Sequence, residues 1–110
     1  MNENERVARL RFAGDLDVYR RTEFEAAFPP PDSIDRIIID MRETSILDSS
    51  IITLLMRYRR AFTEAGGDPL NIVLVVPPSL RRIFEITGLV NLMTILTAAT
   101  EQESDPLTGV

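Results

Sequence analysis

The segment LDSSIITLL sets two adjacent hydroxyls between a carboxylate and an apolar run, which makes its serines the first candidates for chemistry. Asp48 or Ser49 can cap a helix, because their side-chain oxygens accept hydrogen bonds from its first free N–H groups. A cap needs one side chain, and no Glu or Gln follows at the spacing of a capping box. Ser50 is therefore a surplus hydroxyl, at a helix start where free N–H groups and the helix dipole favour a phosphate.

The composition argues against an enzyme. The chain has no His, no Cys and no Lys, so a serine nucleophile would have only carboxylates as bases, and these are weak at neutral pH. The glycine motifs of serine hydrolases, P-loops and dinucleotide-binding folds are absent from the sequence. The acids are scattered and form no calcium-loop pattern. We therefore expect no enzymatic activity, no catalytic residue, no cofactor and no metal site.

Size and charge indicate one ordinary domain without a surface for nucleic acid. The chain has 110 residues, of which 45% are hydrophobic, and no apolar run approaches the roughly 20 residues of a membrane span. Its net charge of −5 leaves no basic stripe for nucleic acid. The amino terminus is charged where a signal peptide would be apolar. We therefore expect a cytoplasmic protein that neither binds nucleic acid nor inserts into a membrane.

Strand and helix patterns alternate along the chain. Short β-branched or alternating runs indicate strands, three- to four-residue apolar spacing indicates helices, and proline and glycine mark the ends. Strands are expected at 7–12, 36–41 and 71–76, and helices at 18–28 after an Asp17 cap, from Asp48-Ser49-Ser50 to 65, and from a Ser79 cap to Gly88. A loop is expected at 42–47, and 92–96 fits a last strand or a helical turn.

Alternation of this kind predicts a single α/β domain with a largely parallel or mixed sheet and right-handed crossovers. Residues 1–96 form this domain, and residues 97–110, which are polar and acidic without periodicity, are expected to be a flexible tail. Sites in open α/β sheets gather where loops leave the carboxyl ends of strands and enter helices. The Asp48-Ser49-Ser50 segment occupies such a position.

Five short motifs resemble, in order and spacing, the landmarks of the STAS family, the domain shared by sulfate transporters and bacterial anti-sigma factor antagonists. They are Gly14-Asp15-Leu16-Asp17, Ile37-Ile38-Ile39-Asp40, Leu47-Asp48-Ser49-Ser50, Ala65-Gly66-Gly67 and Thr87-Gly88-Leu89. The resemblance implies a mixed β-sheet of four or five strands, with helices mainly on one face and an exposed start of the helix that follows Asp48.

The same resemblance implies a function. In the antagonists the second serine of the D-S-S segment is the phosphoacceptor, which here is Ser50. The partner is an anti-sigma factor that is also a serine kinase of the histidine-kinase-like ATPase type; the dephosphorylated antagonist binds it and frees the sigma factor, and a phosphatase resets the switch. The alternative is a STAS subunit that docks, without phosphorylation, on the ATPase of a membrane transport system.

The residues expected to form the switch and partner surface surround Ser50. One of them departs from the family pattern, because Ile51 stands where the family usually has glycine, and its branched side chain would narrow a partner's approach to the acceptor hydroxyl. The expected surface consists of Asp15, Asp17, Asp48, Ser49, Ile51 and Ile52.

Overall fold

The computed structural model describes residues 4–98. Four strands alternate with three α-helices, and short 3₁₀ turns lie between them. The strands are β1 (Val7–Leu16), β2 (Arg36–Leu47), β3 (Ile72–Val76) and β4 (Thr94–Thr97). The α-helices are α1 (Arg21–Ala27), α2 (Ser49–Glu64) and α3 (Pro78–Ile86), and the 3₁₀ turns are η1 (Val18–Arg20), η2 (Pro31–Ser33), η3 (Pro69–Asn71) and η4 (Leu89–Asn91).

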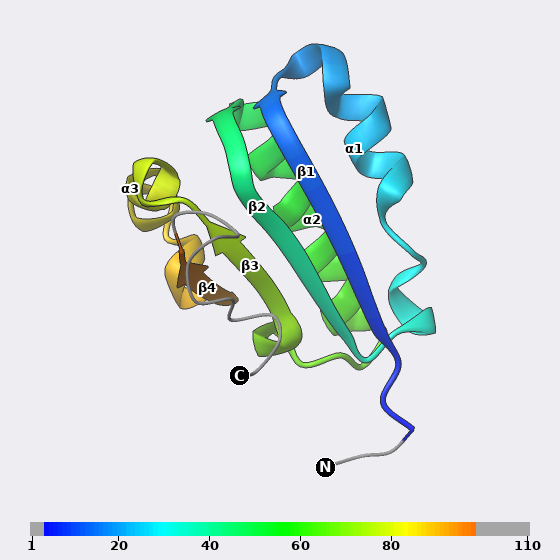
Figure 1. Cartoon of the computed structure of the whole chain (residues 1–110). Helices are drawn as coiled ribbons and strands as arrows, with labels where there is room; N and C mark the ends of the chain where they lie inside the picture. The colour runs from blue at the N-terminus through cyan, green and yellow to red at the C-terminus, as the bar shows by residue number, and fades with distance from the viewer. Residues whose placement is uncertain (1–3, 99–110) are drawn as a thin grey trace.

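The sheet has the order β1-β2-β3-β4, with neighbouring strands also consecutive in the chain. Right-handed crossovers that always step in one direction put every connecting helix on the same face. Accordingly, α2 runs behind β1 and β2 in Figure 1, and none of the described helices crosses the front of the sheet. The predicted α/β fold with helices mainly on one face is confirmed. All three strand pairings among residues 4–98 are parallel, which agrees with the largely parallel alternative of the sequence pattern and differs from the mixed sheet that the family resemblance implied.

The first two strands are longer than predicted. β1 does not stop at Phe12, and the loop expected at 42–47 is instead the second half of β2. The pairing continues because the register shifts after Arg11 and again after Gly14, which keeps the outer parts of both strands hydrogen-bonded. Gly14 has a φ of 76°, a backbone conformation that glycine adopts at little cost. These extensions carry the ends of β1 and β2 to the start of α2.

The apolar core lies between the sheet and its helices. Side chains alternate along β2, so that Ile37, Ile39 and Met41 face the helices and are fully buried. A chain of aromatic rings joins β1 to α1 and α1 to α2, with successive ring centroids 4.7, 4.9, 4.8 and 6.4 Å apart. Its members are Phe12, Phe24, Phe28, Tyr58 and Phe62. These contacts fix α1, which has only seven residues, against the side of α2.

A buried ion pair lies on the opposite face of β2. Arg42 donates from Nη2 to Asp40 Oδ2 at 2.7 Å and from Nε to Oδ1 at 3.0 Å, and the two side chains are 1% and 8% exposed. Burial acts to raise the pKa of Asp40, but the hydrogen bonds and charge of Arg42 outweigh it and hold the pKa below its ordinary value. Asp40 is therefore ionised in the folded protein at neutral pH.

Several element boundaries differ from the sequence-based expectation. The helix expected at 18–28 is a 3₁₀ turn followed by α1, although Asp17 caps it as predicted. α3 begins at Pro78, so Ser79 is not its cap, because proline is well suited to the first turn of a helix. The last segment is a strand rather than a helical turn, and it includes Thr97. The predicted tail from 99 onward lies outside the described residues.

Candidate functional site

The start of α2 is built by Asp48, which was one of the two predicted caps. Its Oδ1 accepts a hydrogen bond from the Ser50 backbone N–H over 2.8 Å, while its own N–H donates to the Leu16 carbonyl over 3.0 Å. The first hydrogen bond caps the N-terminus of α2, and the second connects the start of the helix to the end of β1. Hydrogen bonding from the Ser50 N–H, with a smaller effect of the nearby hydroxyl, holds the pKa of Asp48 below its ordinary value.

The structure brings the predicted acidic residues together at this point. Asp15 pairs with Ile46 across β1 and β2, and Leu16 pairs with Leu47, so Asp15 and Asp17 flank the residue to which Asp48 is bonded. Asp15 is exposed, and Asp17 accepts the Tyr19 N–H at 3.0 Å as the cap of η1. Three carboxylates therefore surround the carboxyl ends of β1 and β2.

The two serines occupy different environments. Ser49 is exposed. Ser50 is half-buried, and its Oγ is buried without a hydrogen-bond partner among the described residues. A buried hydroxyl without a hydrogen-bond partner is unfavourable. The expected exposure of the helix start thus holds for Ser49 and only in part for Ser50.

Ile51 and Ile52 do not belong to the surface that was expected for them. Ile51 is fully buried and Ile52 is 6% exposed, and both pack in the apolar core. The expectation was wrong because these positions fall on the face of α2 that packs on the sheet, as the apolar run after the serines requires. Because Ile51 is fully buried, its branched side chain adds no exposed bulk beside Ser50.

A group of exposed apolar residues beside the carboxylates was missed by the sequence interpretation. Val18, Tyr19 and Ile46 are 52%, 91% and 54% exposed, and they lie at the ends of the same two strands. The only signal was three apolar residues among polar ones, which is common on protein surfaces.

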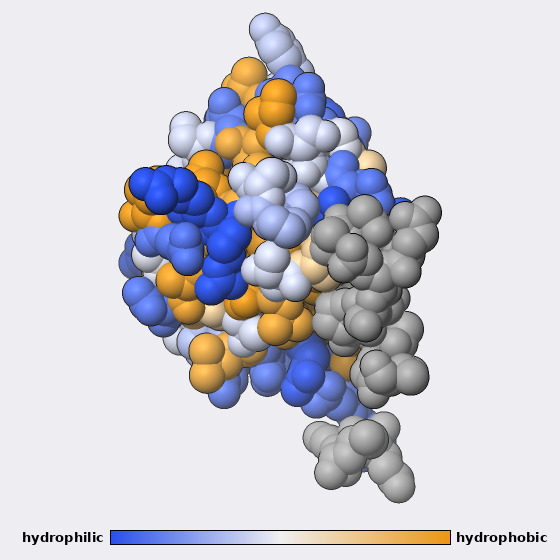
Figure 2. All heavy atoms as spheres, turned by 60° about the vertical axis from the view of Figure 1, so that its left-hand side comes forward, coloured by the Kyte–Doolittle hydropathy of each residue, from blue (hydrophilic) through white to orange (hydrophobic). Residues whose placement is uncertain are grey.

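On the α3 and β4 side, which Figure 2 shows, apolar residues are interspersed with hydrophilic ones.

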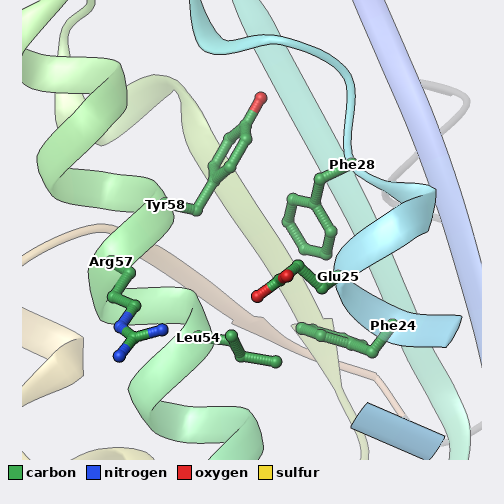
Figure 3. A pocket seen from close by; sticks show the side chains of 6 residues that line it. All are labelled: Phe24, Glu25, Phe28, Leu54, Arg57 and Tyr58. Carbon is green, nitrogen blue, oxygen red and sulfur yellow. The ribbon is translucent and has the colours of Figure 1, made fainter. Parts of the chain in front are cut away.

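The surface between α1 and α2 is hollowed on both sides of Leu54. One cavity of about 190 Å³ has three aromatic residues in its lining, and the Glu25 carboxylate reaches toward α2 (Figure 3). A second cavity of about 200 Å³ is more polar and reaches the start of α2. The first is lined by Phe24, Glu25, Phe28, Leu54, Arg57 and Tyr58, and the second by Arg21, Ser50, Thr53, Leu54 and Arg57.

The described residues include no cluster of three or more His, Cys, Asp or Glu side chains that could hold a metal ion. Of the carboxylates at the ends of β1 and β2, Asp17 and Asp48 accept backbone hydrogen bonds as helix caps, and Asp15 is exposed. Across residues 4–98, every helix is too short or too polar to cross a bilayer. The geometry is that of a small binding surface around a capped helix start.

The comparison with known families agrees with this geometry. The sequence model of the STAS domain matches residues 1–104, and the chain belongs to that family. Its fold resembles that of the Bacillus cell fate determinant SpoIIAA in the phosphorylated form, with a TM-score of 0.63 and 24% identity over 93% of this chain and 90% of the other. It also resembles the anti-sigma factor antagonist SpoIIAA in its unphosphorylated form, with a TM-score of 0.63 and 21% identity over 100% of this chain and 96% of the other.

Proposed function

We propose that this protein is an anti-sigma factor antagonist, a regulatory binding protein without enzymatic activity that acts in the cytoplasm. In its unphosphorylated form it binds an anti-sigma factor of the serine-kinase type and thereby releases a sigma factor. The observation that carries this proposal is the Asp48-capped start of α2, with Ser50 in its first turn, beside the exposed acidic and apolar ends of β1 and β2. STAS membership supports it.

Phosphorylation of Ser50 is the proposed switch. The partner transfers the γ-phosphoryl group of ATP to Ser50 Oγ, with release of ADP and the hydroxyl proton, and a phosphatase removes it again. The phosphate adds about −1.5 to −2 charges near pH 7 to a surface that already holds Asp15, Asp17 and Asp48. The partner surface that meets these carboxylates is proposed to carry cations and an apolar contact for Tyr19.

The helix start offsets much of the cost of this charge to the fold, because free N–H groups and the helix dipole favour an anion there. Phosphorylation should therefore change association far more than stability. The test is a Ser50→Asp variant, with Ser49→Asp as the matched control, measured for affinity to candidate serine-kinase anti-sigma factors and for melting temperature. We expect Ser50→Asp to weaken binding about tenfold or more, with little change in melting temperature. A loss of several degrees with full affinity would contradict the proposal.

A second candidate function is a STAS subunit that docks on the ATPase of a membrane transport system without being phosphorylated. The observation that favours it is the burial of Ser50 Oγ. In that case the exposed residues at the ends of β1 and β2 are still the docking surface, but no kinase modifies Ser50. Affinity for a transport ATPase that is unchanged by Ser50→Ala and lost on Tyr19→Ala would support this candidate.

A further inference from the structure

The polar cavity between α1 and α2 joins Ser50 to two arginines from different helices. Its lining includes Ser50 in the first turn of α2, Arg57 two turns further along, and Arg21 at the first position of α1. The cavity holds about 200 Å³, enough for a phosphate group and water. It therefore has room for a group attached to Ser50.

The Ser50 hydroxyl lacks a hydrogen bond to the described part of the chain in its present position. Its Oγ is buried and has no hydrogen-bond partner among residues 4–98, although the residue itself lines the cavity. Thr53, one turn away on the same side of α2, is already committed, because its Oγ1 donates to the Ser49 carbonyl at 3.1 Å. Ser50 is thus the hydroxyl of this cavity that is available for modification.

Arg57 is placed to reach a group on Ser50. The two Cα atoms are seven residues apart, about 10 Å along the helix. Side chains in helices lean toward the N-terminus, which points Arg57 back along α2. Figure 3 shows its guanidinium at the level of Leu54, one turn nearer the start of the helix. A phosphate on Ser50 would span much of the remaining distance.

Arg21 and Arg57 also stand apart from most arginines on the helices. Three arginines in helical segments form ion pairs with an acid three or four residues further on, and Arg59 donates to a backbone carbonyl. Arg21 and Arg57 make no ion pair or hydrogen bond with any residue in the described part of the chain. The paired residues are Arg20 with Glu23, Arg60 with Glu64, and Arg81 with Glu85.

The charged side chains that line the cavity are two cations, and two anions lie on residues next to it in the chain or in neighbouring cavities. Arg21 and Arg57 line it, Asp48 is bonded to the Ser50 N–H, and Glu25 lines the two neighbouring cavities. Glu25 is exposed and forms no ion pair among residues 4–98. A dianionic phosphate is a stronger partner for guanidinium groups than a single exposed carboxylate, because arginine binds its oxygens with two parallel hydrogen bonds.

From this arrangement we infer that phosphoserine 50 is bound within its own chain by Arg21 and Arg57. The inference deepens the proposed function and rests on it, since it assigns what holds the phosphate that the partner kinase adds. The bound phosphate links α1 to α2 and neutralises both arginines. In the phosphorylated protein the polar cavity is therefore filled and less basic, in addition to the added charge near Asp48.

The test places the phosphate without any kinase. Phosphoserine is incorporated at position 50 during translation, and the second pKa of the phosphate is measured by ³¹P NMR titration. Its ordinary value is about 6, and neighbouring cations lower it while Asp48 and Glu25 act to raise it. We expect this pKa to be about one unit lower in the parent chain than in the Arg21→Gln/Arg57→Gln variant. Arg57→Lys keeps the positive charge but loses the planar set of guanidinium donors, so it should give a phosphate pKa between those of the parent chain and the double variant.

Two controls make the result specific. Arg82→Gln removes an exposed arginine of α3 and should leave the phosphate pKa unchanged. Phosphoserine at position 49, on an exposed side chain, should not respond to loss of Arg21 and Arg57. The same phosphate pKa at position 50 with and without the two arginines would overturn the inference. Because no kinase is involved, this result is independent of whether a partner phosphorylates Ser50.

Discussion

The Asp48 carboxylate accepts a hydrogen bond from the Ser50 N–H over 2.8 Å, so the residue that begins α2 also holds the backbone of the proposed phosphoacceptor. The Asp48 N–H is bonded in turn to Leu16, beside the exposed acids at the end of β1. Helix capping and the proposed switch therefore share one residue, and a change at Asp48 affects both.

Asp48→Ala should lower the melting temperature at neutral pH, and Asp48→Asn should lower it less, because an amide oxygen can still accept the Ser50 N–H. The pKa of Asp48 is lowered in the folded protein, so the stability it provides is present above about pH 3.9 and is lost as the pH falls through the folded value. Melting curves from pH 7 to pH 2 should show the gap between parent and Asp48→Ala narrowing. A gap of constant size would exclude a role for the carboxylate charge.

Asp40→Ala should destabilise the domain by about 3 kcal/mol, because it leaves the guanidinium of Arg42 buried without its carboxylate. The folded pKa of Asp40 is lowered, so the stabilising effect of this ion pair holds above about pH 3.9 and disappears as the pH falls further. Urea unfolding at pH 7 and pH 3 measures both effects. Equal stability of parent and variant at pH 7 would show that the pair contributes nothing net.

Gly67→Ala should cost about 2 kcal/mol, because a Cβ at this position would overlap the fully buried ring of Phe62, 2.7 Å from its Cζ. The matched experiment is a double-mutant cycle with Phe62→Leu, which removes the ring atoms concerned. We expect the double variant to lose less stability than the sum of the single losses. Strictly additive losses would place the strain elsewhere.

Tyr58→Phe should destabilise the domain by about 1 kcal/mol, because the hydroxyl donates to the Pro29 carbonyl at 2.8 Å and so ties α2 to the end of α1. Burial raises the pKa of Tyr58 to about 12. A raised pKa means that folding is favoured below the unfolded value, about 10, and that this contribution is lost as the pH rises toward 12. The parent should therefore lose stability over that range and Tyr58→Phe should not. Tyr19→Phe, at a residue 91% exposed, is the control.

The order of elements could be predicted from the sequence because proline, glycine and apolar periodicity mark their limits clearly. The second half of β2 could not, because residues 42–47 are four polar residues followed by two apolar ones, and this segment becomes a strand only through pairing with the end of β1. Tertiary pairing of this kind overrides local pattern. The 3₁₀ turn before α1 was missed for a similar reason, since a helical pattern does not distinguish the two helix types.

For the site, residue types and order were enough to predict the Asp48 cap, whereas the expectation that Asp15 and Asp17 lie near it came from the family resemblance. Residue types and order could not separate the exposed Ser49 from the half-buried Ser50, because adjacent positions on a helix differ by about a quarter turn and burial depends on what packs there. The same limit applies to Ile51, whose orientation into the core follows from the position of the sheet. Arg21 and Arg57, which line the polar cavity, come from two helices that only the fold brings together.

The most direct test of the proposed function is to locate the phosphate. The purified protein is incubated with ATP and each candidate serine-kinase anti-sigma factor, and the modified residue is found by intact mass and fragmentation of the peptide that contains Ser49 and Ser50. The switch described above predicts a gain of one phosphate on Ser50 that is absent from Ser50→Ala and retained in Ser49→Ala. A phosphate on Ser49, or none with any of these kinases, would contradict it.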